Sequence, residues 1–253
     1  MIKLLNILKE AISSPKAIFL AGPAGSGKSF ISKQLPLSQF QVINVDDTYE
    51  ELLKSSGIGM KLAQMSPDEL KKAGELMGQA RKTTDVKFQN ATKDAKNLLI
   101  DSVGGSPKTL LKKKQELEDL GYDTLMLMTY VSPITSLERN IKRDRSLLPS
   151  IVIRSWRDVN KSIDTYKQVF GNDFILLNND LKDADKSFDE EYIYKTYIEP
   201  LGQIGKEKSP EEKAKSKAES EKIYSDIKQS LNNQPEFDTL EQAQQKITKF
   251  INK

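Results

Sequence analysis

Residues 22–29 read Gly22, Pro23, Ala24, Gly25, Ser26, Gly27, Lys28 and Ser29. The octet follows the pattern G-x-x-x-x-G-K with a final serine or threonine at every position. An apolar run ends at Ala21, just before it, and a helical stretch, Lys28–Gln34, begins inside it. A strand, a glycine-rich turn and a helix in this order are typical of a phosphate-binding loop. Glycines let backbone N–H groups face phosphate oxygens, and the helix N-terminus adds partial positive charge.

Two side chains of the octet predict the ligand. Lys28 is expected to reach the β- and γ-phosphates of a nucleotide, and the hydroxyl of Ser29 is expected to bind Mg²⁺. A glycine turn that only joins a strand to a helix needs neither residue. The sequence therefore predicts a site for ATP or GTP with magnesium.

The composition excludes several kinds of chemistry. The 253 residues are 37% hydrophobic and 30% charged, which suits one α/β domain with an appendage. There is no cysteine and no histidine, so disulfides, thiol nucleophiles and histidine-based acid–base schemes are excluded. The formal charge is +3, from 39 basic and 36 acidic residues, which does not indicate a nucleic-acid partner but leaves one possible. Proton transfer must use Asp, Glu, Lys, Tyr or water.

No targeting or membrane segment is predicted. No apolar run approaches the roughly 20 residues that a membrane span needs. Near the N-terminus, apolar residues repeat at helical spacing, and a helix packed on the domain is expected there, with a membrane-surface anchor as the alternative. These residues are Leu4, Leu5, Leu8, Ala11 and Ile12. A cytoplasmic protein without a membrane partner is expected.

Five short apolar runs alternate with helical stretches. Continuous apolar runs of this length suit strands covered on both faces, and their alternation with helices predicts an α/β fold. We expect a three-layer sandwich around a mostly parallel five-stranded sheet. The runs are Ala17–Ala21, Gln41–Val45, Leu98–Asp101, Thr124–Val131 and Phe174–Leu177.

The chain is predicted to divide into a phosphate-loop domain, residues 1–204, and an extension, residues 205–253. Within the domain, residues 48–97 are expected to form a helical insertion on the acceptor side, broken near Gly57–Gly59 and Ser66–Pro67. The extension begins with a charged linker, because residues 205–222 have almost nothing to bury. Its two helical stretches, residues 223–231 and 240–251, are expected to pack on the domain or on a protein partner.

Acidic residues follow two of the predicted strands. Asp46 and Asp47 come after the second apolar run, where ligands of open α/β sheets bind, so one of them is a candidate base for an acceptor hydroxyl. Either could instead cap a helix beginning near Thr48. Asp101 ends the third run, expected beside the phosphate loop, and is a candidate for magnesium support. Gly104 and Gly105 would let backbone approach the acceptor.

A basic region at residues 135–167 is predicted to form a lid. Arginines that close over a nucleotide stabilise the charge of phosphoryl transfer. Arg139 and Arg143 are four residues apart and are expected to share a helix face, with a break at Leu147–Pro149 as the hinge. Trp156 is expected to pack in the core. The full cluster is Arg139, Lys142, Arg143, Arg145, Arg154, Arg157 and Lys161.

These motifs in this order resemble a family. After the phosphate loop come N-V-D-D at residues 44–47 with Tyr49, then L-I-D-S at residues 99–102, then S-x-x-R-x-x-x-R from Ser136. Over about residues 16–180 the chain resembles the P-loop kinases that include bacteriophage polynucleotide 5′-kinase and the zeta-toxin kinases. The resemblance implies that Asp46, or Asp47 with a one-residue shift, is the general base, and that Arg139 or Arg143 contacts the phosphates.

One departure bears on the acceptor. Polynucleotide kinases carry an arginine shortly after the catalytic Asp, whereas here residues 48–51 read Thr, Tyr, Glu and Glu. This argues against a polynucleotide acceptor. The resemblance implies transfer of the γ-phosphate of ATP to a hydroxyl of a small metabolite, a nucleotide sugar or a nucleic-acid end. The alternative is a P-loop ATPase or nucleotide-binding assembly protein, with the C-terminal helices as its partner arm.

Overall fold

The computed structural model describes residues 14–60, 65–143, 147, 149–180 and 234–253, with isolated positions between 214 and 229. The predicted N-terminal helix lies outside these residues, as do most of the predicted charged linker and of the helical stretch 223–231. Arg145 also lies outside them. None of the helices in the described part is long and apolar enough to cross a membrane.

The core is a five-stranded sheet in which every described strand is parallel to its neighbours. The strand order is β2-β3-β1-β4-β5, so β3 lies directly beside β1, as predicted. Leu20 is paired with Asp101, which brings the end of β3 next to the start of the phosphate loop. The strands are β1 (Lys16–Ala21), β2 (Gln41–Ile43), β3 (Leu98–Asp101), β4 (Asp123–Tyr130) and β5 (Phe174–Asn178).

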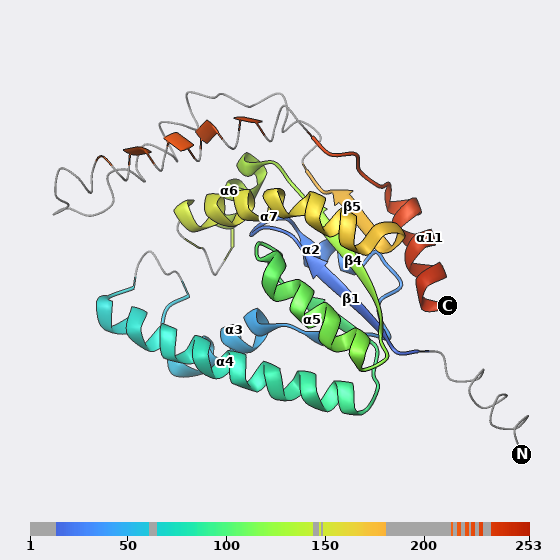
Figure 1. Cartoon of the computed structure of the whole chain (residues 1–253). Helices are drawn as coiled ribbons and strands as arrows, with labels where there is room; N and C mark the ends of the chain where they lie inside the picture. The colour runs from blue at the N-terminus through green and yellow to red at the C-terminus, as the bar shows by residue number, and fades with distance from the viewer. Residues whose placement is uncertain are drawn as a thin grey trace, which may run out of the picture.

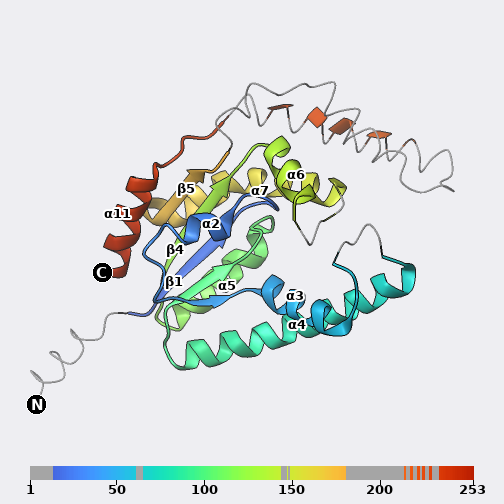
Figure 2. The same ribbon diagram turned by 180° about the vertical axis from the view of Figure 1, so that it is seen from behind.

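Helices cover both faces of this sheet, which confirms the three-layer prediction. On one face lie α5 (Pro107–Asp119) and α7 (Pro149–Phe170), seen in front of the sheet in Figure 1. On the other face lie α2 (Lys28–Ser32) and α11 (Leu240–Ile251), seen in front in Figure 2. A short 3-10 turn, η2 (Gly171–Asp173), leads from α7 into β5.

The continuous apolar runs are explained by burial on both faces. In β1, Phe19 packs into the cluster under α5 and α7, while its neighbours Ile18 and Leu20 pack into the cluster under α2 and α11. Successive side chains of a strand point to opposite faces, so a strand covered twice has no polar face to display.

Two helices lie between β2 and β3, in the stretch where a helical insertion is predicted. They are α3 (Val45–Ser56) and α4 (Pro67–Lys93), so α3 ends beside the predicted break at Gly57 and α4 begins at the predicted break at Ser66–Pro67, where Ser66 forms a capping box. They share a small core of their own, built around Tyr49 and Leu53. In Figures 1 and 2 they extend from the β2 side of the sheet.

The start of α3 differs from the prediction. The helix begins at Val45, not near Thr48, and β2 ends at Ile43. The residue that caps α3 is Asn44, whose side-chain oxygen accepts from the N–H of Asp46 at 2.8 Å. Asp46 and Asp47 therefore do not cap the helix. They lie in its first turn, where negatively charged side chains interact favourably with the partial positive charge of the helix N-terminus.

The basic region contains a short helix, α6 (Pro133–Ile141), followed by α7. Because α6 ends at Ile141 and is capped by Lys142, Arg143 lies beyond it, and the expected helix face shared by Arg139 and Arg143 does not form. The next helix, α7, begins at Pro149, the last residue of the predicted break at Leu147–Pro149. Trp156 is fully buried and donates to the carbonyl of Val131 at 2.6 Å, so it is a core residue, as predicted.

The last helix, α11, packs on the sheet. Its side chains Ala243, Ile247 and Phe250 are buried in the cluster that includes β1, β4 and β5. The segment before it is joined to β5, because the N–H of Leu176 donates to the carboxylate of Asp238 at 2.9 Å. The described part of the extension therefore packs on the domain, which is one of the two arrangements expected from the sequence.

Candidate active site

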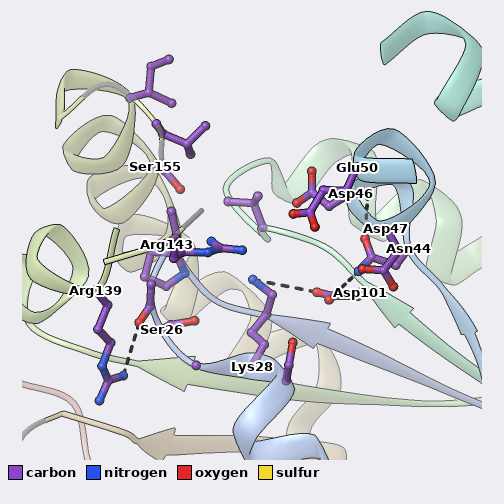
Figure 3. Close-up of a pocket in the computed structure, with 18 residues that line it drawn as sticks. Ser26, Lys28, Asn44, Asp46, Asp47, Glu50, Asp101, Arg139, Arg143 and Ser155 are labelled. Carbon is purple, nitrogen blue, oxygen red and sulfur yellow. Dashed lines mark hydrogen bonds and ion pairs between the residues drawn. The ribbon is translucent and has the colours of Figure 1, made fainter. Parts of the chain in front are cut away.

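A cavity of about 470 Å³ opens where β1 and β3 end, between α3 on one side and α6 and α7 on the other (Figure 3). Most of the predicted site residues line it, contributed by four separate parts of the chain. They are Pro23, Ala24, Gly25, Ser26, Gly27, Lys28, Ser29, Asp46, Asp47, Asp101, Arg139 and Arg143. Gly22 lies at the edge of this group, where its carbonyl accepts from Lys28 Nζ at 3.1 Å.

The phosphate loop is held by hydrogen bonds on both sides. Its last glycine, Gly27, has φ +76° and caps α2, and its carbonyl accepts from the N–H groups of Phe30 and Ile31 at 3.0 Å. Ser26 is buried, and its Oγ accepts from Thr129 Oγ1 on β4 at 2.8 Å. These bonds hold the backbone and Ser26 of the loop in place.

Lys28 lies at the centre of the cavity. Its Nζ is 3.9 Å from Asp101 Oδ1, and the two side chains are only 18% and 15% exposed. A bond to the Gly22 carbonyl keeps the ammonium group on the loop side. A partly desolvated cation at this point is well suited to bind phosphate oxygens.

Asp101 is the most perturbed acid of the site. Burial raises the pKa of Asp101 to about 6, because it outweighs the opposing effect of Lys28, and the nearby Asp46 and Asp47 raise it further. Asn44 Nδ2 also donates to Asp101 Oδ2 at 3.2 Å. Asn44, which joins the cap of α3 to the end of β3, is a site residue that no sequence motif predicts.

The cavity residues fit a magnesium ion. Ser29 and Asp101 offer a hydroxyl and a carboxylate on the same cavity, and Mg²⁺ in nucleotide sites is usually held by one or two protein oxygens together with phosphates and water. No group of three or more acidic residues among the described residues could hold a metal by itself. The donor set thus suits a metal that arrives with a nucleotide.

Three carboxylates on α3 line the cavity, namely Asp46, Asp47 and Glu50. Asp46 and Glu50 project into the cavity, whereas Asp47 lies beside Asn44 (Figure 3). The pKa of Asp47 is raised by burial and by Glu50 and Asp46, against the effect of a hydrogen bond with Asn44. Glu50 is a further site residue that was not predicted, although its position four residues after Asp46 places both side chains on one helix face.

The two candidate arginines lie differently. Arg143 points toward the centre of the cavity, near Lys28, whereas Arg139 points away from it (Figure 3). Arg139 donates to the carbonyl of Gly25 at 3.3 Å and to that of Asn179 at 3.0 Å. Of the other basic residues that the structure describes in this region, Lys142, Arg154, Arg157 and Lys161 do not line the cavity.

A second cavity, of about 530 Å³, adjoins the first and shares Asp101, Val103 and Ser155 with it. Gly104 and Gly105 line it, as do the polar side chains of Thr84, Asp85, Ser106, Thr109, Lys113 and Asp158. Only glycine fits at position 104, because the backbone has φ +78° and an added Cβ would lie 2.6 Å from the Cβ of Ala21.

Comparison with known families identifies the family of this chain. The zeta toxin family model matches residues 3–172, well over half of the chain. The chain belongs to the zeta toxin family. Membership in this family confirms the resemblance drawn from the sequence motifs. The family and the P-loop fold together indicate a kinase-like, nucleotide-dependent phosphotransferase.

Solved structures share the fold at low identity. The complex of AvrRxo1-ORF1 and ORF2 with sulphate ions has a TM-score of 0.52 at 14% identity, covering 89% of this chain and 82% of that one. The same complex with ATP has a TM-score of 0.51 at 13% identity, with 88% and 82% covered. The PezAT toxin–antitoxin system of Streptococcus pneumoniae has a TM-score of 0.47 at 18% identity, with 90% and 93% covered. None of the curated proteins compared with this chain matches it significantly.

Proposed function

We propose that this member of the zeta toxin family is a magnesium-requiring kinase that transfers the γ-phosphate of ATP to a hydroxyl group. The observation that carries the proposal is a single cavity in which Lys28 lies between Arg143 and the carboxylates of α3 (Figure 3). A related fold has been solved with ATP, which favours ATP over GTP.

The proposed roles follow from charge and position. The loop amides and Lys28 bind the phosphates, and Arg143, which points into the cavity, is the candidate cation for the charge that spreads over the transferred group. Ser29 and Asp101 would hold magnesium, which when bound would neutralise charge on the phosphate oxygens. Asp46 accepts the proton of the acceptor hydroxyl, with Asp47 as the alternative base.

The adjoining cavity is the proposed acceptor site. It begins at Asp101 and runs along Gly104 and Gly105 to the first turn of α5. Its volume, about 530 Å³, suits a small molecule. Its lining combines hydroxyls, three carboxylates and one lysine with apolar side chains such as Ile43, Ile100 and Leu110, which suits a small molecule that carries hydroxyl groups, such as a metabolite or a nucleotide sugar.

The test is a transfer assay with γ-labelled ATP and Mg²⁺ against nucleosides, nucleotide sugars, proteins and RNA or DNA ends. We expect label to appear on one small hydroxyl compound and Lys28→Ala to abolish the transfer. The exposed Lys33, at the end of α2, provides the matched control, and Lys33→Ala should retain the wild-type rate.

The opposite results would contradict the proposal. Label transfer that survives Lys28→Ala would remove the phosphate-loop role. Fast, oligomer-dependent ATP hydrolysis that no acceptor stimulates would instead favour an assembly ATPase.

A further inference from the structure

Three successive carbonyl groups of the phosphate loop are held by side chains outside it. The carbonyl of Ala24 accepts from Ser136 Oγ, and that of Gly25 accepts from Arg139 at 3.3 Å. The carbonyl of Ser26 accepts from Asn179 Nδ2 at 2.8 Å. Two of these donors belong to α6, and Asn179 belongs to the turn that follows β5.

These bonds determine how the loop presents its N–H groups. A peptide unit is planar, with its C=O and N–H on opposite sides, so a carbonyl held from one side directs the next N–H to the other. The N–H of Ser26 is used within the loop, by the carbonyl of Pro23 at 3.1 Å. Those of Gly25 and Gly27 are thereby directed away from α6 and Asn179, as phosphate binding requires.

The close approach of these donors also explains two of the glycines. Gly25 has φ +80°, and an added Cβ would lie 2.6 Å from the carbonyl oxygen of Ser136. Gly27 has φ +76°, and an added Cβ would collide with the amide nitrogen of Asn179. The motif glycines at these positions are therefore needed for the packing behind the loop.

The turn at residues 178–180 is itself firmly placed. The backbone N–H of Asn179 donates to the carbonyl of Tyr130 at 2.9 Å, and its carbonyl accepts from Arg139 at 3.0 Å. The carboxylate of Asp180 accepts from the N–H of Ser132 at 2.8 Å, just before α6. The backbone of Asn179 is thus held by β4 and α6, and its side chain extends from this fixed position to the carbonyl of Ser26.

We propose that Asn179, together with Ser136 and Arg139, positions the phosphate loop for triphosphate binding by holding its carbonyl groups from behind. The inference rests on the proposed nucleotide site and adds residues that act through the loop. Arg139 becomes a positioning residue, and Arg143 remains the cation that meets the transferred phosphate.

The test compares two ligands, Mg-ATP and Mg-tripolyphosphate, which share the phosphates but not the base and ribose. We expect Asn179→Ala to weaken both by the same factor, about tenfold, the usual effect of one lost hydrogen bond in a binding site. Asn90→Ala is the matched control, because Asn90 is exposed near the end of α4 and lines neither cavity. The control should leave both affinities unchanged.

Ser136→Ala is a second, smaller deletion on α6 and should also weaken both ligands, so the inference does not depend on the folding of one variant. If Asn179→Ala weakens only Mg-ATP, Asn179 contacts the base or ribose and the inference is wrong. If both variants lower the melting temperature without changing either affinity, the contacts are only structural and the inference is wrong. If the wild-type protein binds both ligands but transfers label to no acceptor, the proposed kinase activity is wrong, whereas the proposed role of Asn179 is unaffected.

Discussion

The carboxylates of α3 lie on one wall of the cavity but differ in their surroundings. Asn44 forms a hydrogen bond with the side chain of Asp47, whereas Asp46 and Glu50 reach toward Lys28 (Figure 3). We therefore expect Asp46→Asn to slow phosphate transfer by at least ~100-fold, the usual effect of losing a general base, while the Kd for ATP stays unchanged. Single-turnover transfer and equilibrium binding measure the two quantities separately.

Asp47→Asn and Glu50→Gln are the matched comparisons, because each removes one charge from the same helix. Both should slow transfer less than Asp46→Asn. A larger loss in Glu50→Gln would identify Glu50 as the base instead.

In the folded, nucleotide-free protein, burial destabilises the charged form of Asp101. Burial raises its pKa to about 6, from 3.8, so at pH 7.5 the folded protein holds a carboxylate that is better solvated in the unfolded chain. Asp101→Asn should therefore stabilise the nucleotide-free protein, by less than the roughly 3 kcal/mol that the full shift represents, because Lys28 loses its partner. The same variant should weaken magnesium-dependent ATP binding.

Urea unfolding at pH 7.5 without nucleotide measures the first effect, and titration of ATP at several magnesium concentrations measures the second. A variant that is less stable and still binds Mg-ATP normally would show that Asp101 has a structural role only.

At the scale of elements, α11 matters because it closes one face of the sheet. Phe250 is 1% exposed within the cluster that contains β1, β4 and β5. We expect Phe250→Ala to lower the free energy of unfolding by about 3–5 kcal/mol, the usual cost of such a cavity. Chemical denaturation measures this change directly.

The neighbouring Lys249 is exposed on the same helix and provides the control. Lys249→Ala should change stability by less than about 0.5 kcal/mol. Equal denaturation midpoints for wild type and Phe250→Ala would mean that α11 is dispensable for the fold.

For the whole molecule, stability at acid pH should depend on an ion pair at the opposite end of the sheet from the phosphate loop. Lys16 is almost fully buried, and its Nζ lies 2.5 Å from Asp123 Oδ2, at the start of β4. Burial acts to raise the pKa of Asp123, but hydrogen bonds from Lys16 and Ser14 outweigh it, so the pKa lies below its usual value.

The sign of the pH effect follows from this shift. A carboxyl whose pKa is lower in the folded state contributes stability above its unfolded pKa of about 4 and loses it as the pH falls through the folded value. Asp123→Asn should cost about 2 kcal/mol at pH 7, below the value for fully buried pairs because Asp123 is half exposed. The difference from wild type should shrink as the pH falls below 4, in urea unfolding at each pH. A difference that stays constant with pH would contradict this account.

Much of the fold could be predicted because the signals are local. Each apolar run of four to eight residues corresponds to a strand, and α4 starts at the break predicted near Ser66–Pro67. The prediction for α3 was wrong because three residues in its first turn are good caps, and only the observed backbone shows that Asn44 takes that position.

The phosphate loop and the alternation of strands and helices were determined by the sequence alone, because each depends on residues that are neighbours in the chain. The tertiary structure decided which side chains meet around that loop. Asn44 contacts Asp101 across 57 residues, Arg139 contacts Gly25 across 114, and Asn179 contacts Ser26 across 153. Such contacts depend on the order of strands in the sheet and on where each helix ends, and neither has a local signal in the sequence.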